Sequence, residues 1–159
     1  MTEPFISDLM PIEPGWIDHN GHLNMAYYGV LFDRGVDKAW DWFGMGLDYV
    51  ATSGFTTFSA EAHIRYLREV KLGDRVRSTF QILDHDPKRI HSFQEMIHED
   101  GWVAATCENL HLSIDQSGPK VAPFPKNVFA RIEEMAGDHA ALPRPEGAGR
   151  PIGIRRKTA

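Results

Sequence analysis

The residues DHNGHLN at positions 18–24 place several polar side chains directly ahead of a long run rich in aromatic residues. A loop that only starts a helix needs one capping side chain, and Asn20 or Asn24 would supply it. Asp18 would then do no more than interact favourably with the positive end of the helix. Capping does not explain why Asp18 and His22 occur together with Asn20, so this loop is also a candidate catalytic site.

The chemistry that these residue types allow is acyl transfer. The first turn of a helix has unpaired backbone amides and a partial positive charge of about +0.5, which can polarise a carbonyl group and hold an oxyanion. A nearby carboxylate such as Asp18 can attack the carbonyl carbon or activate a water molecule. The loop and the start of the helix therefore contain the two parts that an acyl-transfer site needs.

The element that must position this loop is a helix, predicted over residues 25–44. Gly35 costs roughly 1 kcal/mol relative to alanine inside a helix, so we expect another backbone to pass close to it. The apolar positions recur every three or four residues, as in a helix with one buried stripe. They are Tyr28, Leu31, Phe32, Gly35, Val36, Ala39, Trp42 and Phe43.

Alternation of apolar and polar residues predicts four consecutive strands joined as an antiparallel meander. They cover residues 58–66, 75–83, 89–98 and 102–114. In the first of them, Ser59, Glu61 and His63 are expected on the same face. Residues 5–13 are expected to form a further strand, although Pro11 weakens the pattern.

After the meander, a short helix is predicted with Asn127 as its N-cap and Gly137 as its end. Residues 138–159 are rich in Pro, Gly and Arg and lack periodicity, which predicts an extended C-terminal arm. We therefore expect one α+β domain over residues 1–137, with an antiparallel sheet wrapped around a long central helix. A single curled sheet leaves an open edge, so at least a dimer is expected.

The overall composition narrows the class of protein. A net charge of -5 gives no reason to expect binding to nucleic acid or to an anionic membrane. No apolar stretch approaches the roughly 20 residues that span a bilayer. Cys107 is the only cysteine, and the acidic N-terminal residues do not resemble a signal peptide, so a cytoplasmic location is expected. The eight histidines match no metal-ligand spacing, so neither a metal nor a cofactor is expected.

With the segments DHNGHLN, MAYYGVLFDRG and YLREVKLGD, the chain resembles the hotdog-fold acyl-CoA thioesterases of the 4-hydroxybenzoyl-CoA thioesterase type over residues 10–128. The resemblance implies hydrolysis of an acyl-CoA, in which coenzyme A is part of the substrate. It also implies that Asp18 is the catalytic carboxylate and that the backbone N–H of Met25 polarises the carbonyl. The side chains expected to orient groups around them are Asn20, His22 and Asn24. Members of the family often have a second Asn where this chain has Met25.

The segments FSAEAHIRYLREVKLGD, DPKRIHSFQEMIH and APFP are more narrowly similar to betainyl-CoA thioesterases, which are associated with carnitine breakdown. A trimethylammonium group is recognised by aromatic faces with an acidic neighbour. The candidate residues for such a cage are Tyr27, Tyr28, Trp40, Phe58 and Glu61, with Ser59 and His63 beside Glu61. The alternative is that the aromatic residues belong to the core and that Glu61 lies on a solvated strand face.

In this family the acyl-CoA lies across an interface between subunits, which implies a homodimer or homotetramer. Lys88 and Arg89 begin a predicted strand, where they are candidates to meet the CoA phosphates. A hotdog enoyl-CoA hydratase would need an Asp and a His with a different spacing on a longer loop. The remaining alternative is a protein that binds or senses acyl-CoA without turnover, and steady release of the CoA thiol would distinguish the two.

Overall fold

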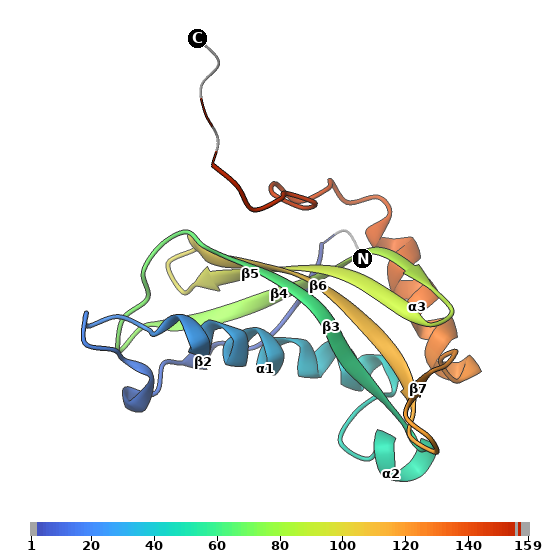
Figure 1. Ribbon diagram of the computed structural model, residues 1–159. Coiled ribbons are helices and arrows are strands. Elements are labelled where there is room, and N and C mark those ends of the chain that lie inside the picture. The colour runs from blue at the N-terminus through green and yellow to red at the C-terminus, as the bar shows by residue number, and fades with distance from the viewer. Residues whose placement is uncertain (1–2, 155, 157–159) are drawn as a thin grey trace.

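A seven-stranded antiparallel sheet curves over the long helix α1 (Met25–Phe43) in the computed structural model (Figure 1). The structure describes residues 3–154 and 156. The main strands follow the order β4 (Arg75–Asp86), β5 (Arg89–His98), β6 (Val103–Asp115) and β3 (Phe55–Tyr66). The short strand β7 (Lys120–Val121) pairs with β6. The predicted α+β class, with a sheet wrapped around a central helix, is confirmed.

Helix α1 begins where its sequence predicts. Asn24 is the N-cap, and its side chain accepts a hydrogen bond from the Ala26 N–H at 3.0 Å. At the other end Gly44, with φ at 83°, adopts the left-handed conformation that glycine tolerates. A Cβ at Gly35 would lie 2.3 Å from the Cβ of Ser78 in β4, so the expected close approach of a second element is confirmed.

Strand β3 corrects one prediction. It begins at Phe55, after a one-turn helix α2 (Tyr49–Ser53), and a bulge at Ala60 interrupts its alternation. Directly opposed residues in an antiparallel pair share a face. Ser59 opposes His111 and lies on the inner face, toward α1, whereas Glu61 and His63 oppose Leu110 and Glu108 on the outer face. This register shows that the prediction of Ser59 on the same face as Glu61 and His63 was wrong, because one extra residue flips every later side chain.

The N-terminal strand prediction was also too simple. Instead of one strand over residues 5–13, β1 (Phe5–Ile6) and β2 (Met10–Pro11) pair separately with β4. Between them the Ser7 hydroxyl accepts the Ser78 N–H at 2.9 Å, which replaces a ladder hydrogen bond by a side-chain contact.

The last helix, α3 (Lys126–His139), starts after Pro125 and continues past the predicted end at Gly137. Its buried stripe includes His139, whose Nδ1 accepts the backbone N–H of Ile82 in β4 at 3.0 Å. This contact holds the last turn on the sheet, which offsets the cost of a glycine inside the helix. The division into residues 1–137 and 138–159 stays a prediction.

Residues 140–150, which follow α3, run across the outer face of the sheet, opposite α1 (Figure 1). The Gln81 side chain donates to the carbonyl of Pro143 at 3.3 Å, and the N–H of Gly149 donates to the Glu108 carboxylate at 2.7 Å. Phe93, on this face, is only 2% exposed. The arm therefore packs on the sheet of its own chain.

Candidate active site at the start of α1

A cavity of about 300 Å³ lies where the loop before α1 meets the segment that follows β3. It brings together residues that are some 40 positions apart in the sequence. Its lining consists of Asp18, His22, Leu23, Met25, Tyr28, Tyr66, Leu67, Arg68 and Glu69.

The loop of residues 18–24 holds Asp18 half-buried at this cavity. Its Oδ1 accepts the backbone N–H of Asn20 at 2.8 Å, and its own N–H donates to the carbonyl of His22 at 3.0 Å. Gly21, with φ at 79°, allows the tight turn between them. No residue in the described part of the chain donates to the second oxygen, Oδ2, so that oxygen is available to a substrate or a water molecule.

The first turn of α1 leaves one amide unpaired at the same cavity. Asn24 occupies two of the first N–H groups: its side chain accepts from Ala26, and its carbonyl accepts from Tyr27 at 3.0 Å. The N–H of Met25 has no acceptor within residues 3–154 and 156. A carbonyl oxygen placed there would accept a hydrogen bond at the positive end of the helix.

The other wall of the cavity comes from the segment after β3. Glu69 lies 3.1 Å from His22, measured between Oε2 and Nε2. The Tyr66 hydroxyl donates to the carbonyl of Met25 at 3.3 Å, and its ring meets Tyr28 edge to face at 5.1 Å. Burial raises the pKa of both tyrosines, so their hydroxyl groups stay protonated at neutral pH.

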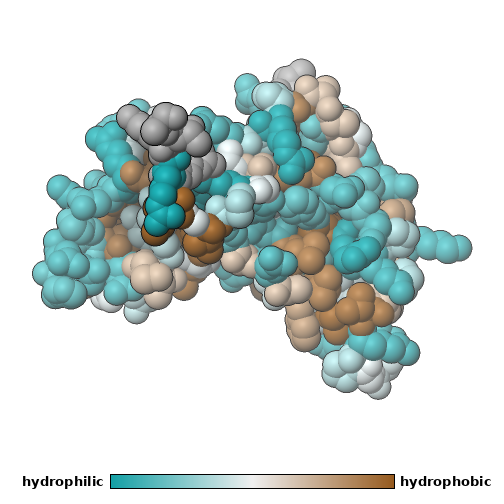
Figure 2. Space-filling model, turned by 45° about the horizontal axis from the view of Figure 1, so that its top comes forward, coloured by the Kyte–Doolittle hydropathy of each residue, from teal (hydrophilic) through white to brown (hydrophobic). Residues whose placement is uncertain are grey.

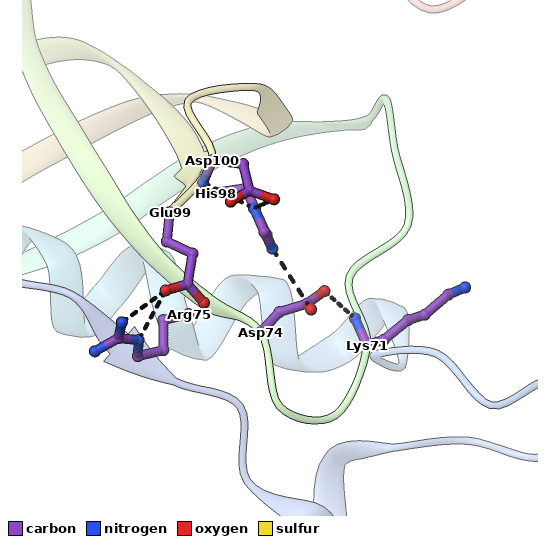
Figure 3. A network of polar contacts seen from close by, with 6 residues as sticks. All are labelled: Lys71, Asp74, Arg75, His98, Glu99 and Asp100. Atoms are coloured by element: carbon purple, nitrogen blue, oxygen red, sulfur yellow. Dashed lines mark hydrogen bonds and ion pairs between the residues drawn. The ribbon is translucent and has the colours of Figure 1, made fainter.

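The turn that follows this segment contacts the end of β5 (Figure 3). The Lys71 N–H donates to the Asp74 carboxylate at 2.8 Å, and Asp74 lies 3.5 Å from His98 at the end of β5. Beside it, Arg75 donates twice to one oxygen of Glu99, at 3.0 and 2.7 Å. These contacts hold the turn that follows the cavity wall against the end of β5.

The other predicted catalytic groups are Asn20, His22 and Asn24, and each has a different position in the structure. Asn24 serves as the helix cap, and Asn20 contributes its backbone N–H to Asp18 while its side chain lies outside the cavity lining. His22 lines the cavity.

The proposed aromatic cage is not assembled within one chain. Tyr28 lines the cavity, but Tyr27 stacks on Trp16 at 5.4 Å. Trp40 packs in the core, with its ring 4.9 Å from that of His111. Phe58 is 52% exposed on the outer face of β3. Ser59 lies on the inner face, where its hydroxyl is 3.5 Å from Nδ1 of His111.

Glu61, His63 and Arg89 line a second cavity, of about 550 Å³, on the outer face of the sheet beneath the arm. Lys88 is exposed and does not line it. Arg89 already pairs with Asp86, at 2.8 Å from Nε, and this contact holds the pKa of the Asp86 carboxyl below its usual range. Because Asp84 and Glu108 also line this cavity, it is a poor environment for phosphate groups within one chain.

Sequence reasoning missed Tyr66 and Glu69 as parts of the cavity, although both lie in the segment YLREVKLGD. Tyr66 is the last residue of the strand predicted over residues 58–66, and Glu69 follows that strand without a periodic pattern. A signal was present, because an aromatic residue and an acidic residue, Tyr66 and Glu69, lie three positions apart at the end of the predicted strand.

The described residues show neither a metal-binding cluster nor a membrane-spanning helix. Residues 3–154 and 156 contain no group of three or more His, Cys, Asp or Glu side chains arranged to hold a metal ion. No helix in that same part of the chain combines the length and apolar character needed to cross a bilayer.

Comparison with known proteins gives consistent matches. Residues 12–132 match the family model described as the thioesterase-like superfamily. The chain is 39% identical over 145 residues to a betainyl-CoA thioesterase of Pseudomonas aeruginosa, and the match covers 91% of each protein. It is 38% identical to an L-carnitine dehydrogenase/betainyl-CoA thioesterase of Rhizobium meliloti, of which it spans 29%. A Staphylococcus aureus protein solved in complex with CoA matches with a TM-score of 0.89 and 30% identity, over 98% of both chains.

Proposed function

Because the chain belongs to the thioesterase-like superfamily and is a thioester hydrolase that acts on acyl-CoA, we propose that its substrate is betainyl-CoA, which it hydrolyses to the free acid and CoA. The hotdog fold and the enzyme class predicted from the resemblance are confirmed by the matches. The observation that carries the proposal for the site is that Asp18 and the unpaired N–H of Met25 line one cavity.

In the proposed mechanism the Met25 N–H donates to the thioester carbonyl oxygen. Negative charge grows on that oxygen in the transition state, where the positive end of α1 stabilises it. Asp18 acts in one of two ways. As a general base it takes a proton from water, whose oxygen attacks the carbonyl carbon. As a nucleophile it attacks directly and forms an anhydride, which water then hydrolyses. In both cases the C–S bond breaks and CoA leaves as the thiolate, which then takes up a proton.

Three further residues have proposed supporting roles. His22 lies at the cavity beside Glu69 and is placed to orient a water molecule or the acyl group. Asn20 holds the Asp18 carboxylate through its backbone N–H, and Asn24 fixes the start of the helix that carries Met25. CoA enters this scheme as part of the substrate, and we propose that no cofactor takes part.

The proposed acyl group is betainyl, and the relatives' names support it. The two curated relatives described above are named for betainyl-CoA, one of them in a protein that also carries an L-carnitine dehydrogenase. The cavity of about 300 Å³ at α1 suits a short acyl group. This chain spans 29% of the length of that second relative.

We further propose that the active enzyme is a homodimer or homotetramer located in the cytoplasm. Strand β3 is an edge strand, and its central residues 58–62 are exposed, which favours pairing with a second copy. The single Cys107 is buried and unpaired, which suits a reducing compartment.

Asp18→Asn tests the proposed site. This change removes the negative charge, and the new side chain can neither attack a carbonyl nor accept a proton efficiently. We expect kcat for betainyl-CoA to fall by about 10³-fold or more. The measurement is steady release of the CoA thiol, with the unfolding free energy of the variant measured beside it.

Asp48→Asn is the matched control, because Asp48 is exposed and lies outside both cavities described above. It should keep the wild-type rate. A rate for Asp18→Asn within about tenfold of wild type would contradict the assignment. The absence of thiol release from every acyl-CoA tried with the wild-type protein would favour the alternative of a binding or sensing protein.

A further inference from the structure

We infer that Glu69, together with the ring of Tyr66, selects a positively charged acyl group at the α1 cavity. This inference rests on the proposed function, since it concerns the acyl group that the same site accepts. A trimethylammonium group has no N–H to donate, so a protein can recognise it only through charge and through contact with aromatic faces. The wall formed after β3 offers both.

Glu69 is held at the cavity by the backbone on either side of it. The N–H groups of Leu67 and Arg68 both donate to the carbonyl of Ala104, at 2.9 and 3.0 Å. On the other side, the carbonyl of Val70 accepts the N–H of Leu23 at 2.8 Å. The Glu69 side chain itself is 63% exposed, so its carboxylate is accessible to a ligand in the cavity.

The charges around this cavity favour a cation. Asp18 and Glu69 contribute two carboxylates, and among the described residues of the lining only Arg68 carries a permanent positive charge. The Arg68 guanidinium lies over the ring of Trp102, 4.0 Å from its centroid, so its charge is directed to that ring. An acyl group carrying a carboxylate would be repelled here, and an acyl group carrying a quaternary ammonium would be attracted.

The aromatic ring stands next to the reacting position. Tyr66 is 45% exposed, and its hydroxyl is tied to the carbonyl of Met25, the residue whose N–H is proposed to receive the thioester oxygen. Tyr28 meets the Tyr66 ring edge to face and limits its movement. In betainyl-CoA a single methylene separates the quaternary nitrogen from the carbonyl carbon, so the cation must lie close to Met25. Tyr66 and Glu69 line that same cavity.

The experiment compares two substrates of the same shape. Betainyl-CoA carries the quaternary nitrogen, and 3,3-dimethylbutanoyl-CoA replaces it by a neutral carbon. We expect wild-type kcat/KM to favour betainyl-CoA by about tenfold or more, the scale of one charge contact at a partly exposed site. Glu69→Gln should remove most of this preference by lowering kcat/KM for betainyl-CoA while the neutral substrate changes by less than about threefold.

Three variants sharpen the comparison. Glu69→Asp keeps the charge and should retain more of the preference than Glu69→Gln. Tyr66→Phe keeps the ring and should retain more of it than Tyr66→Leu. Glu134→Gln, on the exposed side of α3, removes a carboxylate far from the cavity and should keep the wild-type preference.

The outcomes separate this inference from the proposed function. Equal losses for both substrates in Glu69→Gln would overturn the inference and make Glu69 a positioning residue for His22. Turnover of both substrates by the wild type without a preference for the cation would also overturn it, while leaving thioester hydrolysis by Asp18 intact. Failure of the wild type to hydrolyse betainyl-CoA, with turnover of other acyl-CoAs, would remove both the proposed substrate and the inference.

Discussion

At the scale of single residues, Asp18 and Asn24 are both held by backbone amides. Asp18 accepts the N–H of Asn20, and Asn24 accepts the N–H of Ala26. A backbone donor restricts a side chain more than a second mobile side chain does. The candidate carboxylate is therefore oriented before any substrate arrives, which reduces the entropy lost on reaching a reactive geometry.

His111 is different, because side chains surround it on the inner face of the sheet. Its Nε2 lies 3.0 Å from the Ser92 hydroxyl, and the Trp40 ring meets it edge to face. Burial lowers the pKa of His111 from 6.5 to about 4. The imidazole is therefore neutral in the folded protein at neutral pH.

This buried histidine makes stability depend on pH. The unfolded chain binds a proton at His111 below about pH 6.5, whereas the folded protein binds it only near pH 4. Its contribution to stability is thus complete above pH 6.5 and is lost as the pH falls toward 4. We expect a loss of about 2 kcal/mol in unfolding free energy between pH 7.5 and pH 5 from this group. Urea unfolding at a series of pH values measures it.

His111→Gln is the reference for that measurement, because it removes the titrating group. Its unfolding free energy should fall less steeply over the same pH range. Parallel curves for the variant and the wild type would show that His111 does not cause the dependence.

At the scale of elements, the position of α1 on the sheet depends on one close contact. Gly35 faces Ser78 of β4, and no side chain fits between them. The helix can approach β4 only with a glycine at this point, and the same approach places the start of α1 against the cavity. A Cβ at Gly29, six residues earlier, would lie 4.0 Å from Cδ1 of Ile64, which is an ordinary contact distance.

The two glycines make a matched pair for mutation. Gly35→Ala forces α1 away from β4 and should lower the unfolding free energy by about 1–3 kcal/mol. Gly29→Ala removes the helix cost of glycine without a clash and should be neutral or stabilising by up to about 1 kcal/mol. Urea unfolding at pH 7.5 compares them. Equal effects of the two changes would contradict the role given to the close contact.

At the scale of the whole molecule, the two faces of the sheet are covered in different ways. Helix α1 covers the inner face, and residues 140–150 cross the outer face (Figure 1). The space-filling view shows apolar residues in separate patches among hydrophilic ones (Figure 2). The edge strand β3 remains uncovered at its middle, where Phe58 is exposed.

A charge at this edge should weaken association of the chains. We expect the wild type to sediment as a dimer or larger, rather than as a chain of 18.0 kDa. Phe58→Lys should weaken association by about tenfold or more, because pairing would bury the new charge. Leu47→Lys is the control, since Leu47 is fully exposed and lies outside β3. The same sedimentation profile for both variants would place the interface elsewhere.

The sequence by itself determined the elements whose patterns are local. The stripe from Tyr28 to Phe43 and the cap at Asn24 specify α1, and alternation predicts β5 and most of β4. The loop of residues 18–24 was identifiable as a candidate site because its polar groups exceed what one cap requires. These signals depend on residues within a few positions of one another, so they can be recognised in the sequence without knowledge of the fold.

Only the tertiary structure decided which distant residues meet. The bulge at Ala60 turned Glu61 and His63 to the outer face, although nothing in the alternation of β3 marks it. The approach of Glu69 to His22 depends on how the sheet curls around α1 and brings the exit of β3 to the start of the helix. Such contacts join segments tens of residues apart, and their distance is set by packing rather than by local pattern.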